Sequence, residues 1–368
     1  MKNYLDFEKE IKALEQEVDG LKSPFGSEGI SEVDTDKIKN TQREINQKLE
    51  EIYSNLNSWQ KTQVARHEDR PKANFYIKKI FTQFTLLSGD RYFGDDKSVI
   101  AGFGLIDNKS VLIIGQEKGE DLNSRIERNF GMMRPEGYRK CIRLMKLADR
   151  FQIPVISFID TPGAYPGIGA EQRGQASAIA NSIECCMSLT VPNISIIIGE
   201  GGSGGAIALA SSNKVIMLEN SIYSVISPEG CASILWRDPS KSLQAAEAMK
   251  LTAKDLLKLK IIDEVIPEPL GGAHRDPDSI AADIKYSIIK NLKAFENFSK
   301  DEVYDHRKTK FLQIGRDQGF SNSSNLSDGN LSYKDSGFKK VKSHIRSNIF
   351  VYGGLGLLLL ASFIAILS

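Results

Sequence analysis

The chain has 368 residues, of which 41% are hydrophobic and 26% charged, and its formal net charge is +1. These values are ordinary for a soluble globular protein with room for a substantial core. The near-neutral charge argues against a nucleic-acid binder, which usually carries a concentrated basic face.

The four cysteines are Cys141, Cys185, Cys186 and Cys231. None forms a C-x-x-C pair, so we predict neither a zinc ribbon nor a thioredoxin-type site, and no metal in this chain. The adjacent Cys185 and Cys186 are expected to be small core residues. The first 21 residues are charged and lack an apolar run. No secretory signal is therefore predicted, and the globular body is expected in the cytoplasm with reduced thiols.

Two amphipathic helices are predicted before residue 60. Apolar residues recur at helical spacing from Leu5 to Leu21 and again from Ile38 to Trp59, with Pro24, Gly26 and Gly29 between them. This pattern predicts a helical hairpin that braces or contacts another surface. A long coiled coil is the alternative, but too few heptads are sustained to favour it.

From Val99 onward the pattern changes to strands that alternate with helices. Residues 99–106 and 111–116 predict a β-hairpin, and apolar runs at 153–159, 193–198 and 214–218 predict further strands. Helices are expected over 135–151, 171–189, 205–211 and 278–297. Such apolar strands between helices indicate a parallel or mixed sheet that is covered on both faces.

The carboxyl-terminal segment has a different composition. Residues 318–334 are rich in Ser, Asn, Gly and Asp, which is typical of a flexible linker. The segment from Ile349 to Leu367 carries no charge and follows Lys339, Lys340, Lys342 and Arg346. A run of roughly 19 apolar residues is just long enough to cross a membrane. We predict a membrane anchor with the body on the cytoplasmic side, and a terminal helix packed on a partner is the alternative.

A glycine-rich stretch, GEGGSGGA, runs from Gly199 to Ala206 between a predicted strand and a predicted helix. It fits the dinucleotide pattern G-x-G-x-x-G, although the helix that follows is very short. It also fits the nucleophile pattern G-x-S-x-G, which would need a downstream acid and histidine. No Lys-Ser/Thr follows, so a Walker loop is excluded. What remains is a site at which backbone N–H groups bind an anion or oxyanion.

A second loop, DTPGAYPG, runs from Asp160 to Gly167 after the strand at 153–159. Pro162 and Pro166 stiffen a turn that glycines permit. Ligands of open α/β folds bind at the carboxyl ends of neighbouring strands, so the two loops are expected to form one site. Two tight turns without a ligand are the alternative. No histidine cluster or metal-ligand set is found, so positioned backbone dipoles are the expected chemistry.

Several long motifs in this order resemble the carboxyltransferase alpha subunits of multi-subunit acetyl-CoA carboxylase. The resemblance covers residues 5–316. The motifs are RNFGM at 128–132, PEGYRK at 135–140, FIDTPGAYPG at 158–167, EQRGQ at 171–175, GEGGSGGA at 199–206, SVISPEGCASILW at 224–236 and IPEPLGGAHR at 266–275, with LDFE at 5–8 and ARH at 65–67.

The resemblance implies an α/β, crotonase-like (ClpP/crotonase) superhelical core with the helical hairpin before it and the hydrophobic tail after it. It divides the chain into a helical region at 1–70, a carboxyltransferase catalytic domain at 71–316, a linker at 317–346 and a candidate transmembrane helix at 347–368. The expected partners are a beta subunit in an α2β2 assembly, a biotin carboxyl carrier protein and a biotin carboxylase. The beta subunit would hold zinc, and only the biotin carboxylase would use ATP.

The resemblance also implies the reaction, which transfers a carboxyl group from carboxybiotin to acetyl-CoA to give malonyl-CoA for fatty acid synthesis. The backbone N–H groups of Gly204 and Gly205 would hold the ureido oxygen of biotin, and Glu200 would anchor the loop rather than act as a base. Further pocket residues would be Gly163, Ala164, Tyr165, Pro166, Gly167, Gly201, Gly202, Ser203, Pro228, Glu229 and Gly230. Three alternatives stay open: another CoA-handling crotonase-fold enzyme, a nicotinamide dehydrogenase and a non-catalytic subunit that only docks beta.

Overall fold

The computed structural model describes residues 3–22, 25–26, 29–30 and 35–316. Its centre is an eight-stranded mixed sheet with the strand order β10-β8-β7-β6-β5-β4-β3, and β9 pairs with the end of β7. The strands are β3 (Thr82–Leu86), β4 (Val99–Ile106), β5 (Lys109–Gln116), β6 (Val155–Thr161), β7 (Asn193–Gly202), β8 (Lys214–Leu218), β9 (Ile222–Ser224) and β10 (Glu264–Ile266). The pairs β3–β4 and β4–β5 are antiparallel, and the other pairs are parallel.

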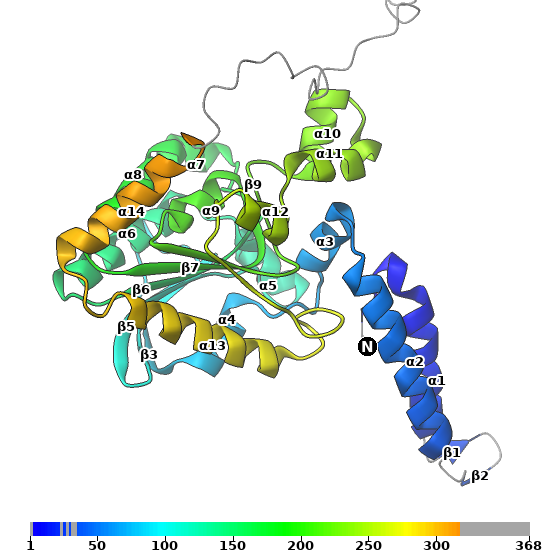
Figure 1. Ribbon diagram of the computed structural model, residues 1–368. Helices are drawn as coiled ribbons and strands as arrows, with labels where there is room; N and C mark the ends of the chain where they lie inside the picture. The colour runs from blue at the N-terminus through cyan, green and yellow to red at the C-terminus, as the bar shows by residue number, and fades with distance from the viewer. Residues whose placement is uncertain (1–2, 23–24, 27–28, 31–34, 317–368) are drawn as a thin grey trace, which may run out of the picture.

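Helices cover both faces of the sheet, as predicted (Figure 1). One face packs against α6 (Pro135–Arg150), α8 (Gln175–Ser188), α9 (Ser203–Ala210) and α12 (Ala253–Lys258). The other packs against α4 (Ala73–Ile80) and α13 (Pro277–Ala294). Every residue of β6 and β7 is buried, because a parallel strand between two helical layers has no face in water. Cys185 and Cys186 are buried in the first of these layers, as predicted.

The remaining helices lie around this core. They are α1 (Lys9–Lys22), α2 (Thr35–Ser54), α3 (Ser58–Ala65), α5 (Leu122–Glu127), α7 (Ile168–Gln172), α10 (Pro228–Trp236), α11 (Ser242–Met249) and α14 (Lys300–Gln313), with 3₁₀ turns η1 (Asp6–Glu8), η2 (Asn129–Gly131) and η3 (Pro239–Lys241). Two short strands, β1 (Phe25–Gly26) and β2 (Gly29–Ile30), pair between α1 and α2.

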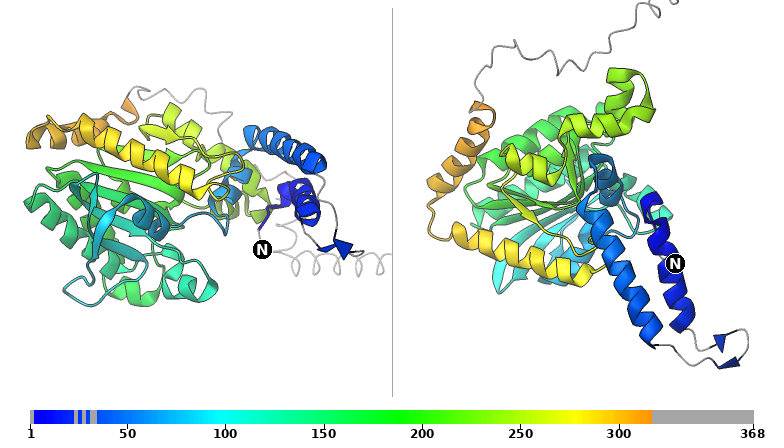
Figure 2. Two further views of the ribbon diagram at one scale, coloured as in Figure 1. Left: turned by 90° about the horizontal axis from the view of Figure 1, so that it is seen from below. Right: turned by 45° about the vertical axis from the view of Figure 1, so that its right-hand side comes forward.

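The predicted amino-terminal hairpin is present. Helices α1 and α2 pack through Ile11, Val18, Ile45 and Leu49, and Figure 2 shows the pair projecting from the body. The hairpin is attached at its base, where Arg275 donates hydrogen bonds to the carboxylates of Glu8 and Glu15. It is therefore a bracing element tied to the loop before α13.

Three predicted elements have other bounds in the structure. The helix expected from Ile38 to Trp59 is two helices, because α2 ends at Ser54 and the Asn57 side chain caps a new helix, α3. The helix expected over 171–189 is two helices, α7 and α8, because Gly174 adopts a left-handed φ of 80° between them. The strand expected to end at residue 198 continues to Gly202, because its end pairs with both Thr161 and β9. None of the helices in the described part is long and apolar enough to cross a membrane. The predicted anchor from Ile349 to Leu367 lies outside the described residues.

Candidate active site

The two glycine-containing loops meet at one edge of the sheet, as expected for neighbouring parallel strands. A Cβ atom on Gly202 would lie 2.2 Å from the carbonyl oxygen of Pro162, and one on Gly205 would lie 2.6 Å from the carbonyl carbon of Gly163. Neither position can hold a side chain while the backbones stay this close. The glycines thus bring the two backbones into direct contact.

The start of α9 presents free backbone donors. Its N-cap residue is Gly202, which has no side chain to accept a hydrogen bond from the first turn. Ser203 adopts a left-handed φ of 51° at the junction between strand and helix. The N–H groups of the first turn, including those of Gly204 and Gly205, have no intrahelical acceptor. Such a turn binds negative charge, because its N–H groups and the helix dipole point the same way.

The side chains of two buried glutamines donate hydrogen bonds to backbone carbonyl groups of these loops and of a neighbouring segment. The side-chain amide of Gln116, at the end of β5, donates to the carbonyl oxygen of Gly205 at 2.8 Å. The amide of Gln175, at the start of α8, donates to the carbonyl oxygens of Met133 and Tyr165 at 2.8 and 3.0 Å. Both glutamines are almost fully buried. The conformations of both loops are therefore fixed by hydrogen bonds from the core.

A buried charge network links the loops laterally. Lys118 Nζ lies 2.7 Å from Asp160 Oδ1 and 3.3 Å from Glu200 Oε2, and the backbone N–H of Glu200 donates to Asp160 Oδ1 at 2.9 Å. Burial alone would lower the pKa of Lys118, but the charges of Asp160 and Glu200 outweigh it and raise that pKa. Glu200 is thus an anchor of the glycine loop, in agreement with the role expected for it.

Arg66, which follows α3, extends this network to α10. It donates from Nε and Nη2 to Glu200 Oε1 at 2.8 and 2.6 Å, and from Nη1 to Glu229 Oε1 at 2.6 Å. Ser227 caps α10 by accepting the Gly230 N–H at 3.1 Å. The first turn of α10 is therefore held beside the glycine loop.

These elements border an open cavity of about 520 Å³, which we call the loop cavity. It is lined by Arg66, Pro162, Gly163, Ala164, Ser203, Val225, Ile226, Ser227 and Glu229. No histidine is among the described residues that line it, which argues against a serine-hydrolase triad built on Ser203. Ser203, at the start of α9, and Glu229, in the first turn of α10, both line this space.

The structure separates the predicted site residues into three groups. Gly163, Ala164, Ser203 and Glu229 line the loop cavity. The glycines at 201, 202 and 205 are buried behind it, and the Cβ position of Gly204 faces Ile179 at 3.5 Å. Tyr165, Pro166, Gly167, Pro228 and Gly230 are not among its lining residues in the described part of the chain. The Tyr165 ring instead stacks on the Arg134 guanidinium, at 4.7 Å from its centroid.

Sequence reasoning missed Arg66, Gln116 and Lys118 as functional residues. Arg66 lies in the ARH motif, but nothing in its neighbourhood predicts its pairing with Glu229, which is 163 residues away. Gln116 is the last residue of a predicted strand and Lys118 comes two residues after it, and this position is the one signal that could have placed them near a site.

The chain matches a known protein family over most of its length. A family model described as "Acetyl co-enzyme A carboxylase carboxyltransferase-like" matches residues 4–315. The chain belongs to this family. A carboxyl transferase subunit alpha of acetyl-coenzyme A carboxylase from Pelagibacter ubique is 70% identical over 322 residues, which cover 88% of each chain. The subunit of the same name from Nitrobacter winogradskyi is 52% identical over 320 residues, which cover 87% of this chain and 99% of that one.

A solved structure supports the fold of this carboxyltransferase alpha subunit. A chain from a Pseudomonas malonate decarboxylase hetero-tetramer in complex with coenzyme A matches with a TM-score of 0.51 at 15% identity. The match covers 67% of the present chain and 100% of the other. The crotonase-like α/β fold that the motifs implied is therefore confirmed.

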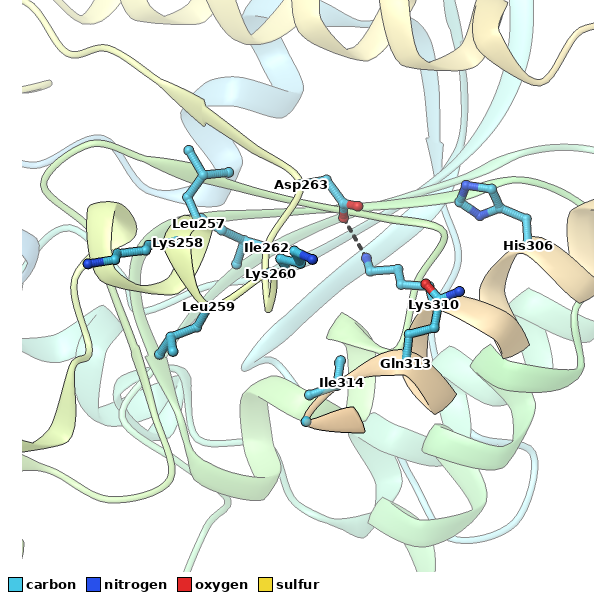
Figure 3. Close-up of a pocket in the computed structure, with 11 residues that line it drawn as sticks. Leu257, Lys258, Leu259, Lys260, Ile262, Asp263, His306, Lys310, Gln313 and Ile314 are labelled. Carbon is cyan, nitrogen blue, oxygen red and sulfur yellow. Dashed lines mark hydrogen bonds and ion pairs between the residues drawn. The ribbon is translucent and has the colours of Figure 1, made fainter. Parts of the chain in front are cut away.

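A second cavity lies away from the loops of the family motifs. Its volume is about 530 Å³, and it lies between α12 and α14, where Leu257, Asp263, His306 and Lys310 are among its lining residues (Figure 3). Lys310 Nζ pairs with Asp263 and donates to the carbonyl oxygens of Ser212 and Asn213. These contacts attach α14 to the sheet, so the charged residues of this cavity have a structural role. Within the described ranges, no group of three or more His, Cys, Asp or Glu side chains could hold a metal ion.

Proposed function

We propose that the chain, as the alpha subunit of an acetyl-CoA carboxylase, transfers the carboxyl group of carboxybiotin to acetyl-CoA together with a beta subunit. The observation that carries this proposal is the uncapped first turn of α9, held against the backbone of residues 162–163 within the loop cavity. The names of the relatives support the acceptor and the multi-subunit organisation. Residues 71–316 would form the catalytic domain.

In this proposal the N–H groups of Gly204 and Gly205 stabilise negative charge on the ureido oxygen. The C–N bond of carboxybiotin breaks, carbon dioxide leaves, and the electron pair moves onto the ureido group. The ureido nitrogen then takes a proton from the acetyl methyl group, and the resulting acetyl-CoA enolate attacks the carbon dioxide. One donor of this kind contributes roughly 3 kcal/mol to lowering the barrier.

The other components would lie on separate chains. A biotin carboxyl carrier protein would present carboxybiotin, a biotin carboxylase would use ATP to form it, and the beta subunit would bind acetyl-CoA and hold zinc. An isomerase or hydrolase of the same fold would instead need a side-chain base in the cavity. Glu229 is the carboxylate there, and although burial opposes it, the hydrogen bond from Arg66 holds the pKa of Glu229 below its usual value. A carboxylate with a lowered pKa is a poor base, which favours the transferase.

The reverse reaction tests this function directly. The chain combined with a beta subunit should transfer a carboxyl group from malonyl-CoA to free biotin, and the chain alone should not. The measurement is acetyl-CoA formation that depends on biotin. Transfer by the isolated chain would contradict the proposed need for the beta subunit. No transfer by the complex would contradict the proposed function.

We also propose that residues 347–368 tether the enzyme to the inner face of the cell membrane. The support is the uncharged run from Ile349 to Leu367 after a basic segment. Ultracentrifugation of lysed native cells should place the full chain in the membrane fraction and a chain truncated after Gln318 in the supernatant. Recovery of both chains in the supernatant would contradict the tether and leave the carboxyltransferase proposal intact.

A further inference from the structure

A smaller cavity shares Arg66 and Pro162 with the loop cavity, and we call it the cationic pocket. The charged side chains that line it are those of Arg66, Lys72, Lys118, Arg125, Asp160 and Glu200. Its volume is about 210 Å³. Cavities that hold drug-sized ligands are usually about 300–1,000 Å³, so this pocket has room for a small ion or a single functional group.

Two of the four cations have no close carboxylate partner. Lys72 is 8% exposed, and its Nζ donates to three backbone carbonyl oxygens and to no carboxylate among the described residues. Arg125 Nε lies 3.4 Å from the carbonyl oxygen of Gly119, and Nη1 lies 3.5 Å from the carboxylate of Glu68. These distances are at the outer limit of hydrogen bonding, and the Glu68 side chain is 64% exposed, so water screens this pair.

The other two cations are already neutralised. Arg66 pairs with Glu200, and Lys118 pairs with Asp160. His67 also lines the pocket and is neutral, because its Nδ1 accepts a backbone N–H. The pocket therefore keeps an excess of two positive charges, which a phosphate dianion would balance.

The pocket also offers free donors that a ligand can reach. An ammonium group has three N–H donors, and the contacts of Lys118 Nζ with Asp160 at 2.7 Å and Glu200 at 3.3 Å use two of them. The third has no acceptor among the residues that the structure describes. The side chains of Lys118 and Arg125 are 15% and 21% exposed, so a small ion can contact both.

A strained turn lies at the same pocket. Phe130, in the RNFGM motif, lines it and is 43% exposed. Asn129 and Phe130 both adopt left-handed conformations, with φ of 48° and 55°, which are rare for a bulky residue. Such conformations cluster at ligand-binding and active sites. Phe130 does not line the loop cavity, so the cationic pocket is the better explanation for this turn.

We propose that the cationic pocket binds a phosphate group with two negative charges, contacted by Arg125 and Lys118 and balanced in part by the buried charge of Lys72. The inference goes beyond the proposed carboxyl transfer and does not depend on it. A carboxylate would balance only one of the two charges, so acetate should bind more weakly than phosphate.

Phosphorus NMR titration of the full chain at constant ionic strength tests the site, with inorganic phosphate as the probe. Arg125→Met and Lys72→Met should each weaken binding by about 10- to 100-fold, the range expected for one interaction with a charged group. Lys97→Met is the matched control, because Lys97 pairs with Glu127 in α5, at the surface, and does not line the pocket. It should leave the dissociation constant unchanged. If Lys72→Met fails to fold, Arg125→Met decides the matter.

The affinity should also depend on pH through Lys72. The charged and titratable groups around it are His67, Arg70, Lys118, Arg125 and Asp160. Burial lowers the pKa of Lys72 to about 8, and the neighbouring cations add to this effect although Asp160 opposes it. Phosphate binding favours the charged ammonium, so affinity should fall as the pH rises through about 8. Phosphate gains its second charge at lower pH, so Lys72→Met should lose this fall.

The phosphate group could be free or belong to CoA, and competition separates the two sources. In the complex with the beta subunit, CoA should displace inorganic phosphate if its 3′-phosphate occupies the pocket, and dephospho-CoA should not. If the ion is free, neither should displace it.

Three results would overturn the inference. They are no binding of phosphate by the full chain, binding of acetate as tight as that of phosphate, and unchanged phosphate binding in Arg125→Met. Biotin-dependent acetyl-CoA formation is measured for the same chain in complex with beta. Normal transfer without phosphate binding would remove the pocket and leave the proposed function intact, whereas phosphate binding without transfer would do the reverse.

Discussion

Gly205→Val is expected to reduce carboxyl transfer by more than about a hundredfold, the loss seen when an oxyanion donor is removed. The Cβ atom of the new side chain would lie 2.6 Å from the carbonyl carbon of Gly163 and 2.7 Å from its oxygen. Backbone atoms cannot move aside as a flexible side chain can, so the two loops must separate and the N–H donors must shift. The measurement is the rate of biotin-dependent acetyl-CoA formation by the complex with beta.

The steric conflict in this variant is with the second loop, because the Cβ position of residue 205 faces the backbone of Gly163. Gly94→Val is a matched control, because a Cβ atom there would meet nothing within 4 Å. It should retain the normal rate. Full activity of Gly205→Val in a normally assembled complex would remove this loop from the mechanism.

The largest expected loss of stability is at the buried pair of Arg70 and Glu268. Their side chains are 1% and 0% exposed. Arg70 donates to both oxygens of Glu268 and from Nε to the Ile198 carbonyl oxygen at 2.7 Å. Arg70→Met would leave the buried carboxylate of Glu268 without a cation partner, which costs about 3–5 kcal/mol of unfolding free energy. Chemical denaturation measures this loss.

The same pair predicts a pH dependence. Burial would raise the pKa of Glu268, but Arg70 outweighs burial and lowers it. A carboxylate with a lowered folded pKa stabilises the fold above its unfolded pKa, and this contribution is lost as the pH falls through the folded value. The unmodified chain should therefore lose stability in acid, below about pH 4.5, and the Arg70→Met variant should lose less.

Lys79→Met is the control for the stability loss of Arg70→Met. It breaks an exposed pair with Asp278 and should cost at most about 1 kcal/mol of unfolding free energy. Equal losses at both positions would contradict the argument.

The central strands could be predicted because their residues are mostly apolar, as strands buried on both faces require. Strands β5 to β8 are apolar runs, and parallel strands buried on both faces need such runs. The end of β7 could not be predicted, since glycine disfavours strands and only pairing with Thr161 and β9 extends the strand through Gly202.

For the candidate site, the meeting of the two loops could be predicted, but the long-range contacts around them could not. The loops at 160–167 and 199–206 follow adjacent parallel strands, so their meeting was expected. The cavity also depends on Arg66, which contacts Glu200 and Glu229 at separations of 134 and 163 residues. No local pattern encodes such contacts. Tyr165 stays a predicted pocket residue, and its ring contacts Arg134 at the start of α6, a contact that no local pattern encodes either.

The attachment of the amino-terminal hairpin has a consequence for synthesis on the ribosome. Glu8 is fully buried in the folded chain, yet its partner Arg275 lies 267 residues later. At a translation rate of about 5–20 residues per second, roughly 13 to 53 s pass before that partner is made. Helices α1 and α2 can pair early through their own apolar residues. The hairpin is thus made early but is among the last segments to dock, and meanwhile the surface that it will cover is open to chaperones and proteases.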